Sequence, residues 1–307
     1  MTGHGGAISL QCVLLGVPNF SEGRDAGLVE RVSAQFAAGV RLLDSHSDPV
    51  HNRTVLTLAG RPRALGESLA RGAGACLMTI DMRRHEGAHP CVGALDVCPL
   101  VWTAAGDREA ARIDALGVAE AIAAEGVPVF LYGELASAPE RRERAFFRAG
   151  GIEQLSERMV TGELRPDLGP PAPHPSAGAT LVTARAPLAA FNLFLEGAGM
   201  DGAHQIAASL RESGGGLPGV RAIAVDLGAA GAQISTNVHD PVAVPLVAVV
   251  ERVRALARAE GGYVGACEVV GLVPEAALEG FPEDVAVPGF DPERHVIERA
   301  VARADAR

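Results

Sequence analysis

Residues 80–99 read IDMRRHEGAHPCVGALDVCP, a stretch that holds two histidines, two arginines, two aspartates and a glutamate. Glycine and proline interrupt it, and we therefore predict a loop between two strands. Loop side chains are not needed to pack a core, so chemistry better explains such a dense polar composition. Loops at strand ends commonly form the mouth of a ligand site in α/β proteins.

Within this stretch, His85 to His89 match H-E-x-x-H, the signature of zinc peptidases. The signature requires both histidines one turn apart on a helix. Gly87 weakens such a helix, and Pro90 disfavours the helical conformation at His89 itself. We therefore expect no metal here and look for another use of the two histidines.

Length and composition restrict the class of protein. The chain has 307 residues, which predicts two domains. Its net charge of −10 argues against nucleic acid as a partner. All 27 basic residues are arginine, which excludes a lysine nucleophile or Schiff base. A local arginine-lined pocket for an anionic small molecule remains possible.

Targeting signals are not evident in the sequence. The five cysteines form no C-x-x-C pair, and residues 1–6 lack the basic and then apolar order of a signal peptide. No apolar run reaches the length that spans a membrane. These features predict a cytoplasmic protein with free thiols that does not act at a membrane.

Apolar strands and amphipathic helices alternate along the chain, with several direct steps from strand to strand. This pattern predicts α/β sandwiches with mixed sheets and helices packed on them, rather than a purely parallel fold. The strands are expected at residues 12–20, 40–43, 54–58, 97–103, 127–132, 179–185, 189–195, 220–227, 232–236 and 267–273.

Two further segments have a distinctive composition. Residues 141–161 are rich in charge and are predicted to form a helix with a solvated face. Residues 165–178 contain five prolines, and their composition alone favours a linker between the domains.

Three polar clusters, at residues 44–53, 80–96 and 237–241, are expected at strand ends. Histidine suits proton transfer near neutral pH, and arginine can bind carboxylates through two parallel hydrogen bonds. Aspartates could orient a histidine, although Asn52 and Asn237 could equally be turn formers. The clusters predict a transferase or hydrolase that acts on an anionic small molecule by acid/base catalysis, with the candidates His46, His51, His85, His89, Arg53, Arg83, Arg84, Asp44, Asp48 and Asp96.

Several blocks, in one order, resemble the glutamate formiminotransferase family. The block VPNFSEG at residues 17–23 resembles the opening of that family, and the stretch at 80–99 resembles its most specific motif. Pro166-Asp167 and the residues from Gly169 to Gly178 resemble its folate segment. Further matching blocks are NRTV at 52–55, VPVFLYGE at 127–134, QISTN at 233–237 and VGLVP at 270–274.

The resemblance implies two α/β subdomains, residues 1–183 and 184–307, with a ligand tunnel between them. It implies transfer of a formimino group between N-formimino-L-glutamate and N5 of tetrahydrofolate, without a metal, by a cytoplasmic homodimer. Catalysis is then expected from His89. Folate binding is expected from Gly169, Pro170, Pro171, Ala172, Pro173, His174, Pro175, Ser176, Ala177 and Gly178, and substrate contacts from Asn19, Asp44, His51, Asn52, Arg53, Arg84, His85 and Asn237.

Some positions depart from the family pattern. His46 and His51 match only part of the family, and aromatic residues expected near Pro173 and Ala177 are missing. Two alternatives therefore stay open, namely a glutamate formyltransferase that uses 5-formyltetrahydrofolate and a non-catalytic folate-binding protein. We also expect the form of the enzyme that lacks a cyclodeaminase domain.

Overall fold

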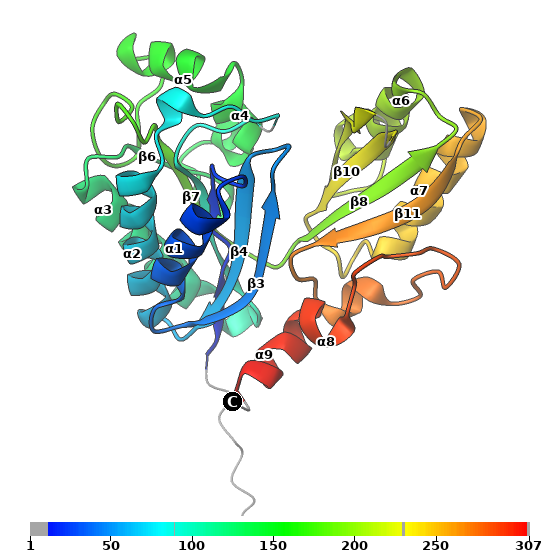
Figure 1. The fold of residues 1–307 in the computed structure, drawn as a ribbon, viewed down its shortest axis with the longest axis horizontal. Coiled ribbons are helices and arrows are strands. Elements are labelled where there is room, and N and C mark those ends of the chain that lie inside the picture. The colour runs from blue at the N-terminus through cyan, green and yellow to red at the C-terminus, as the bar shows by residue number, and fades with distance from the viewer. Residues whose placement is uncertain (1–11, 89, 229–230, 306–307) are drawn as a thin grey trace, which may run out of the picture. The chain divides into compact units, whose positions relative to one another are not determined.

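The computed structural model describes residues 12–88, 90–228 and 231–305. The chain divides into two compact units (Figure 1). The first comprises the residues up to 41 together with 47–54 and 58–185, and the second comprises 42–46, 55–57 and the residues from 186 onward.

The first unit is built around a mixed sheet. In this sheet β1 and β2 lie between β4 and β5. Beyond β4, the sheet continues with β3. Beyond β5, it continues with β7 and then β6. The pairs that β1 makes with β4 and β5 are antiparallel, whereas β7 pairs in parallel with β5 and β6. The strands are β1 Leu14–Gly16, β2 Asn19–Phe20, β3 Arg41–Asp48, β4 Arg53–Gly60, β5 Leu95–Trp102, β6 Val129–Leu131 and β7 Thr180–Arg185.

Helices α1 (Ala26–Ala37), α2 (Ala64–Thr79) and α3 (Arg108–Ala124) stand side by side against this sheet (Figure 1). The Asp25 carboxylate begins α1 by accepting a hydrogen bond from the Leu28 amide at 3.0 Å. Phe36, near the end of α1, is fully buried and stacks on Phe20.

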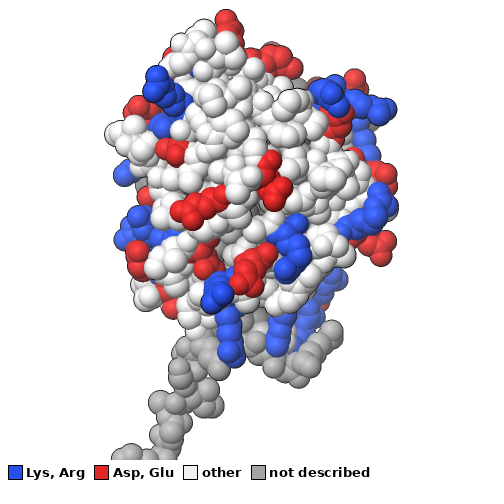
Figure 2. Space-filling view, turned by 90° about the vertical axis from the view of Figure 1, so that its left-hand side faces the viewer, with Lys and Arg blue, Asp and Glu red and all other residues white. Residues whose placement is uncertain are grey.

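On the face shown in Figure 2, arginine and acidic side chains lie interspersed with wide uncharged areas.

A second group of short helices, α4 (Arg144–Arg148) and α5 (Gly151–Val160), covers another part of the same sheet. Their buried side chains Phe147 and Leu155 pack with Phe130 of β6 and Leu181 of β7. The rings of Phe130 and Phe147 lie 5.1 Å apart, in a tilted arrangement. This packing anchors α4 on the sheet and so fixes the arginines at its two ends.

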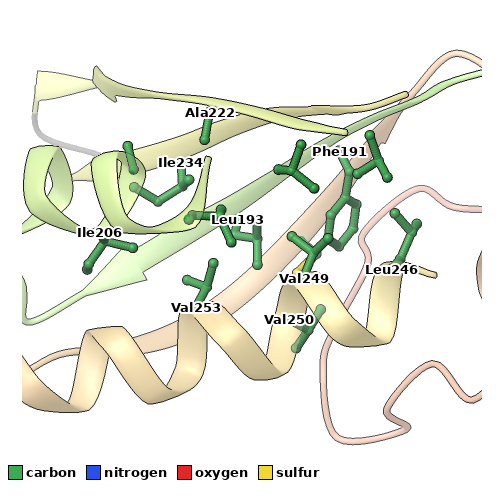
Figure 3. Close-up of a cluster of buried hydrophobic side chains, with 14 of the residues drawn as sticks. Phe191, Leu193, Ile206, Ala222, Ile234, Leu246, Val249, Val250 and Val253 are labelled. Atoms are coloured by element: carbon green, nitrogen blue, oxygen red, sulfur yellow. The ribbon is translucent and has the colours of Figure 1, made fainter. Parts of the chain in front are cut away.

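The second unit is a four-stranded antiparallel sheet in the order β11-β8-β10-β9, covered by α6 and α7 on one face (Figure 1). Side chains of β8 alternate, so that Phe191 and Leu193 point into the core while Asn192 does not. Figure 3 shows these two side chains meeting Ile206 of α6 and Val249 of α7. The elements are β8 Ala189–Glu196, α6 Met200–Leu210, β9 Val220–Asp226, β10 Ala232–Val238, α7 Leu246–Ala259, β11 Tyr263–Val270, α8 Pro292–His295 and α9 Ile297–Asp305.

The predicted α/β units with mixed strand order and packed helices are confirmed, and several boundaries are corrected. The strand expected at 12–20 is broken into β1 and β2, because Pro18 has no amide hydrogen for the ladder. The loop expected at 44–53 begins later, since β3 continues to Asp48. The helix expected at 141–161 is three pieces, interrupted at Glu143 and Gly150.

Residues 165–178 are not a linker between the two units. They lie inside the first unit and lead into β7. Among the described residues, no helix combines the length and apolar character that crossing a membrane requires.

The contact between α1 and α2 supplies a test of the packing. A Cβ added at Gly72 would lie 2.1 Å from the Phe36 ring, whereas one at Gly74 would meet nothing within 4 Å. We expect Gly72→Ala to lower the free energy of unfolding by about 1–3 kcal/mol through overpacking. Gly74→Ala, on the same helix, should raise it by roughly 0.5–1 kcal/mol. Urea unfolding measures both, and equal effects of the two substitutions would contradict this packing.

Candidate active site

The Asn52 side chain joins three polar loops. Its Oδ1 accepts a hydrogen bond from the Gly23 amide at 3.0 Å, and its Nδ2 donates to the Glu86 carbonyl at 3.0 Å. The same Nδ2 lies 3.4 Å from Nδ1 of His85. Asn52 is buried and has a φ of 48°, a left-handed conformation that asparagine tolerates better than most residues. Asn52 therefore acts as a turn former and as the link between the loops.

The backbones of two of these loops, at residues 50–51 and 87–88, also lie close together, and we call this meeting of the loops the Asn52 junction. The Ala88 amide donates to the Val50 carbonyl at 3.2 Å. A Cβ added at Gly87 would lie only 2.4 Å from the His51 carbonyl oxygen, so only glycine fits there. The residues from His85 to Ala88 are not helical, and the geometry that H-E-x-x-H needs is therefore not present in them. His89 lies outside the described residues.

His85 is held in a partly buried position between these loops. Burial lowers the pKa of its imidazole, while a hydrogen bond with the Ser21 backbone and the charge of Glu22 oppose that shift. Ser21 is itself fixed, because its hydroxyl donates to the Gly93 carbonyl at 2.7 Å. A lowered pKa makes His85 neutral at pH 7, so that it can accept or donate a hydrogen bond.

Asp48 and His51 are joined by a side-chain hydrogen bond between one carboxylate oxygen and ring Nδ1. The other carboxylate oxygen accepts from the amides of Val50 at 2.8 Å and His51 at 3.0 Å. Burial alone would raise the pKa of Asp48, but the hydrogen bonds from His51 outweigh it and lower that pKa. The arrangement orients the ring by holding Nδ1 toward the carboxylate.

Asp96 occupies a bulge in β5. Asn19 pairs with Val97 and Phe20 with Leu95, so Asp96 is the extra residue. In a regular strand Asp96 and Val97 would face opposite sides. Here Val97 joins the cluster that contains Phe147 of α4, and Asp96 forms an ion pair with Arg148 of α4. The Asp96 carboxylate is buried, and its second oxygen accepts from the Val92 amide at 2.8 Å.

Arg144 and Arg148 were not among the predicted site residues, yet both interact with Asp96. Residues 141–161 were expected to present a solvated face, but Arg144 and Arg148 interact electrostatically with Asp96 and with each other. Burial and the charge of Arg148 lower the pKa of Arg53 to about 10. Burial raises the pKa of Tyr132, although Arg144 and Arg185 oppose that shift. The sequence RRERAFFR did contain a signal, since its two phenylalanines anchor a helix whose arginines are one turn apart.

Other predicted site residues have local partners or lie elsewhere. Asn19 is buried, and its amide donates to the Val17 carbonyl at 2.9 Å. Arg83 binds both carboxylate oxygens of Asp81, at 2.8 and 2.7 Å. Arg84 is exposed in a short 3-10 helix, and Asn237 lies in β10 of the second unit. Asp44 and His46 are on β3, in the segment that belongs to the second unit.

Within residues 169–178, residues 174–178 form a hairpin turn that is closed on itself. His174 and Gly178 exchange two backbone hydrogen bonds, at 2.8 and 2.9 Å. The His174 ring accepts from the Ala177 amide at 3.1 Å. The Ser176 carbonyl accepts from the Met82 amide at 2.7 Å, and the Ala177 carbonyl from the Ala94 amide at 2.9 Å. The hairpin is thus attached directly to the 80–99 stretch.

Both parts of the chain match one protein family. Residues 13–185 match the N-terminal subdomain of the formiminotransferase domain, and residues 190–281 match the formiminotransferase domain. The chain is 38% identical over 287 residues to the glutamate formimidoyltransferase of Streptococcus pyogenes, covering 92% of this chain and 96% of that protein. It is 36% identical over 295 residues to the glutamate formimidoyltransferase of Thermoplasma acidophilum, covering 94% and 97%.

A third relative is longer. The formimidoyltransferase-cyclodeaminase of Sus scrofa is 40% identical over 272 residues, which cover 85% of this chain but 50% of that protein. The chain therefore corresponds to about half the length of the bifunctional relatives.

The Asn52 junction can be tested by separating its hydrogen bonds from its backbone conformation. Asn52→Gly keeps the left-handed backbone but loses the side-chain bonds, and should lower the free energy of unfolding by about 1–3 kcal/mol. Asn52→Ala adds the strain of a positive φ, roughly 1 kcal/mol more. Urea unfolding followed by circular dichroism compares the variants. An alanine variant as stable as the wild type would rule out this role for Asn52.

Proposed function

The chain belongs to the formiminotransferase domain family, and we propose that it transfers a formimino group between N-formimino-L-glutamate and N5 of tetrahydrofolate. The observation that carries this proposal is the match to that family along both parts of the chain, together with near full-length relatives named glutamate formimidoyltransferase. Tetrahydrofolate is then a co-substrate. We also propose that the subdomains correspond to residues 1–183 and 184–307.

The reaction requires balanced proton transfers. The amidine carbon of formiminoglutamate is electrophilic when the group is protonated, and N5 of the folate attacks it. A bond forms between N5 and this carbon, and the bond from the carbon to the glutamate nitrogen breaks. N5 loses a proton and the departing nitrogen gains one, so a single histidine can serve first as base and then as acid.

We assign this proton shuttle to His89, which matches the histidine of the family's H-P step. Two neighbouring histidines have different surroundings. His85 takes part in the Asn52 junction, and His51 is oriented by Asp48. His51 is the alternative shuttle, because a carboxylate that holds Nδ1 is a common way to orient an acid/base histidine.

We propose that folate lies along residues 169–178, whose hairpin turn at 174–178 is attached to the 80–99 stretch through Met82 and Ala94. Holding both substrates beside one another would lower the entropic part of the barrier. The predicted cytoplasmic location, homodimer and independence from metals remain predictions.

Direct assay tests the function. Purified protein, tetrahydrofolate and formiminoglutamate should yield 5-formiminotetrahydrofolate, detected by its absorbance. A folded protein without product would refute the proposal. Turnover only with 5-formyltetrahydrofolate would identify a formyltransferase, and tight folate binding without either turnover would identify a binding protein.

The shuttle is tested by substitution. His89→Ala should lower kcat by about 10²–10⁴-fold, the usual contribution of a general acid/base. His204→Ala, at an exposed position on α6, is the control and should keep full activity. If His51→Ala loses that much activity and His89→Ala does not, the role belongs to His51.

A further inference from the structure

The hydrogen bonds of Asn52 determine which ring nitrogen of His85 carries the proton. Oδ1 of Asn52 accepts from the Gly23 amide at 3.0 Å, which identifies the other atom of that side chain as the NH2 group. This group donates one hydrogen to the Glu86 carbonyl at 3.0 Å and lies 3.4 Å from Nδ1 of His85. An amide NH2 has two hydrogens and accepts none, so Nδ1 must accept the second hydrogen.

The proton of the neutral His85 ring is therefore on Nε2. Burial lowers the pKa of His85, and the backbone hydrogen bond with Ser21 opposes that shift. A bond with this effect runs from a ring N–H to the Ser21 carbonyl, which fits a proton on Nε2 because Nδ1 is the acceptor. Both ring nitrogens thus have partners within the protein, and neither is left to exchange a proton with a substrate.

The Asn52 junction holds the two segments that carry the candidate shuttles. His51 directly precedes Asn52 in the sequence, and His89 directly follows Ala88. The Ala88 amide is itself bound across the junction, to a carbonyl in the turn that contains His51, at 3.2 Å. A change in the His85 ring therefore alters the bonds that hold both segments.

Protonation of His85 would remove the acceptor that Asn52 uses. The protonated ring has an N–H at both nitrogens, so the amide NH2 of Asn52 would face another donor at Nδ1. Asn52 cannot reverse its amide to supply an oxygen, because the bonds to Gly23 and Glu86 fix its orientation. A donor that faces a donor in a partly buried place is destabilising, so the junction would open.

Three charged groups from the neighbouring segments act on the His85 ring. Glu22 and Arg24 lie in the turn before α1, and Asp96 lies in β5. The carboxylates favour the protonated ring and the guanidinium opposes it, but burial is the largest influence and lowers the pKa below its ordinary value of about 6.5. The bond to Asn52 is therefore present at neutral pH and is lost when the pH falls below that lowered pKa.

We propose that His85 is a positioning residue that holds the Asn52 junction in its neutral Nε2–H form, and that protonation of its ring opens the junction. This role takes the place of the substrate contact that the family resemblance suggested for His85. The effect on turnover rests on the proposed function, because it concerns the histidines on either side. The tautomer and the opening of the junction do not depend on that function.

Nuclear magnetic resonance of the wild type, prepared with isotope-labelled histidine, tests the tautomer directly. At neutral pH the ring-nitrogen signals of His85 should be those of a neutral ring with its proton on Nε2. Asn52→Asp should raise the pKa of His85, because a carboxylate beside Nδ1 favours an N–H there. A proton on Nδ1 in the wild type, or an unchanged pKa in folded Asn52→Asp, would overturn the proposal.

Hydrogen exchange tests the opening without any substrate. The Gly23 and Ala88 amides are bound within the junction. Their protection, corrected for the intrinsic effect of pH, should fall about 10-fold as the pH is lowered through the pKa of His85, which is the value of one hydrogen bond. The Tyr132 amide, bound to the Val182 carbonyl in the same unit, is the internal control and should keep its protection.

His85→Asn separates the position of the acceptor from its titration. The side-chain oxygen of the new residue can take the place of Nδ1 and accept from Asn52, but it gains no proton in this pH range. Protection at Gly23 and Ala88 should then stay high and become independent of pH, whereas His85→Leu, without an acceptor, should show low protection throughout.

Protection that does not change with pH in the wild type would refute the opening, as would the full pH dependence in folded His85→Asn. Circular dichroism establishes whether the variants fold. The measurements on the wild type decide the proposal even if they do not.

The pH profile of kcat/KM tests the effect on turnover. It should fall more steeply with acid in the wild type than in His85→Asn, because in the wild type both His85 and the shuttle must be neutral. His204→Asn, at an exposed position on α6, is the matched control and should keep the wild-type profile. Equal slopes in wild type and His85→Asn would contradict the positioning role. A protein without turnover would refute the proposed function alone, since resonance and exchange need no substrate.

Discussion

The buried carboxylate of Asp96 is the group around which the first unit is arranged. A charge taken out of water must be paired, because its desolvation otherwise costs several kcal/mol. The bulge in β5 turns Asp96 toward α4, and Arg148 and the Val92 amide complete its partners. That requirement fixes the last residue of α4, and the Phe130–Phe147 packing fixes the rest of the helix. The chemistry of the neighbouring loops depends on this frame.

Asn52 plays the corresponding part on the loop side of the site. The Asn52 side-chain amide lies in the turn into β4. It is within hydrogen-bond distance of Gly23, in the turn before α1, and of His85 and Glu86, in the loop after α2. Its left-handed backbone and the missing Cβ at Gly87 allow the loops to approach this closely.

The fold class and most strands could be predicted from the sequence, because apolar periodicity reports which side chains face a core. The ion-pair partner of a charged residue cannot be predicted in this way, because it depends on contacts between segments that are distant in the sequence. Asp96 and Arg148 are 52 residues apart, and nothing in their local sequence connects them. For this reason residues 141–161 were expected to be a solvated helix. The proline-rich residues 165–178 were misread similarly, because composition does not show the backbone bonds to Met82 and Ala94.

All 27 basic residues of the chain are arginine, and the absence of lysine has a chemical consequence. Amidines such as a formimino group react readily with primary amines, and a lysine near the donor would be a competing acceptor. Guanidinium groups stay protonated and are poor nucleophiles at any physiological pH. A chain whose basic residues are all arginine therefore offers no lysine amine that could compete as acceptor for an activated one-carbon group.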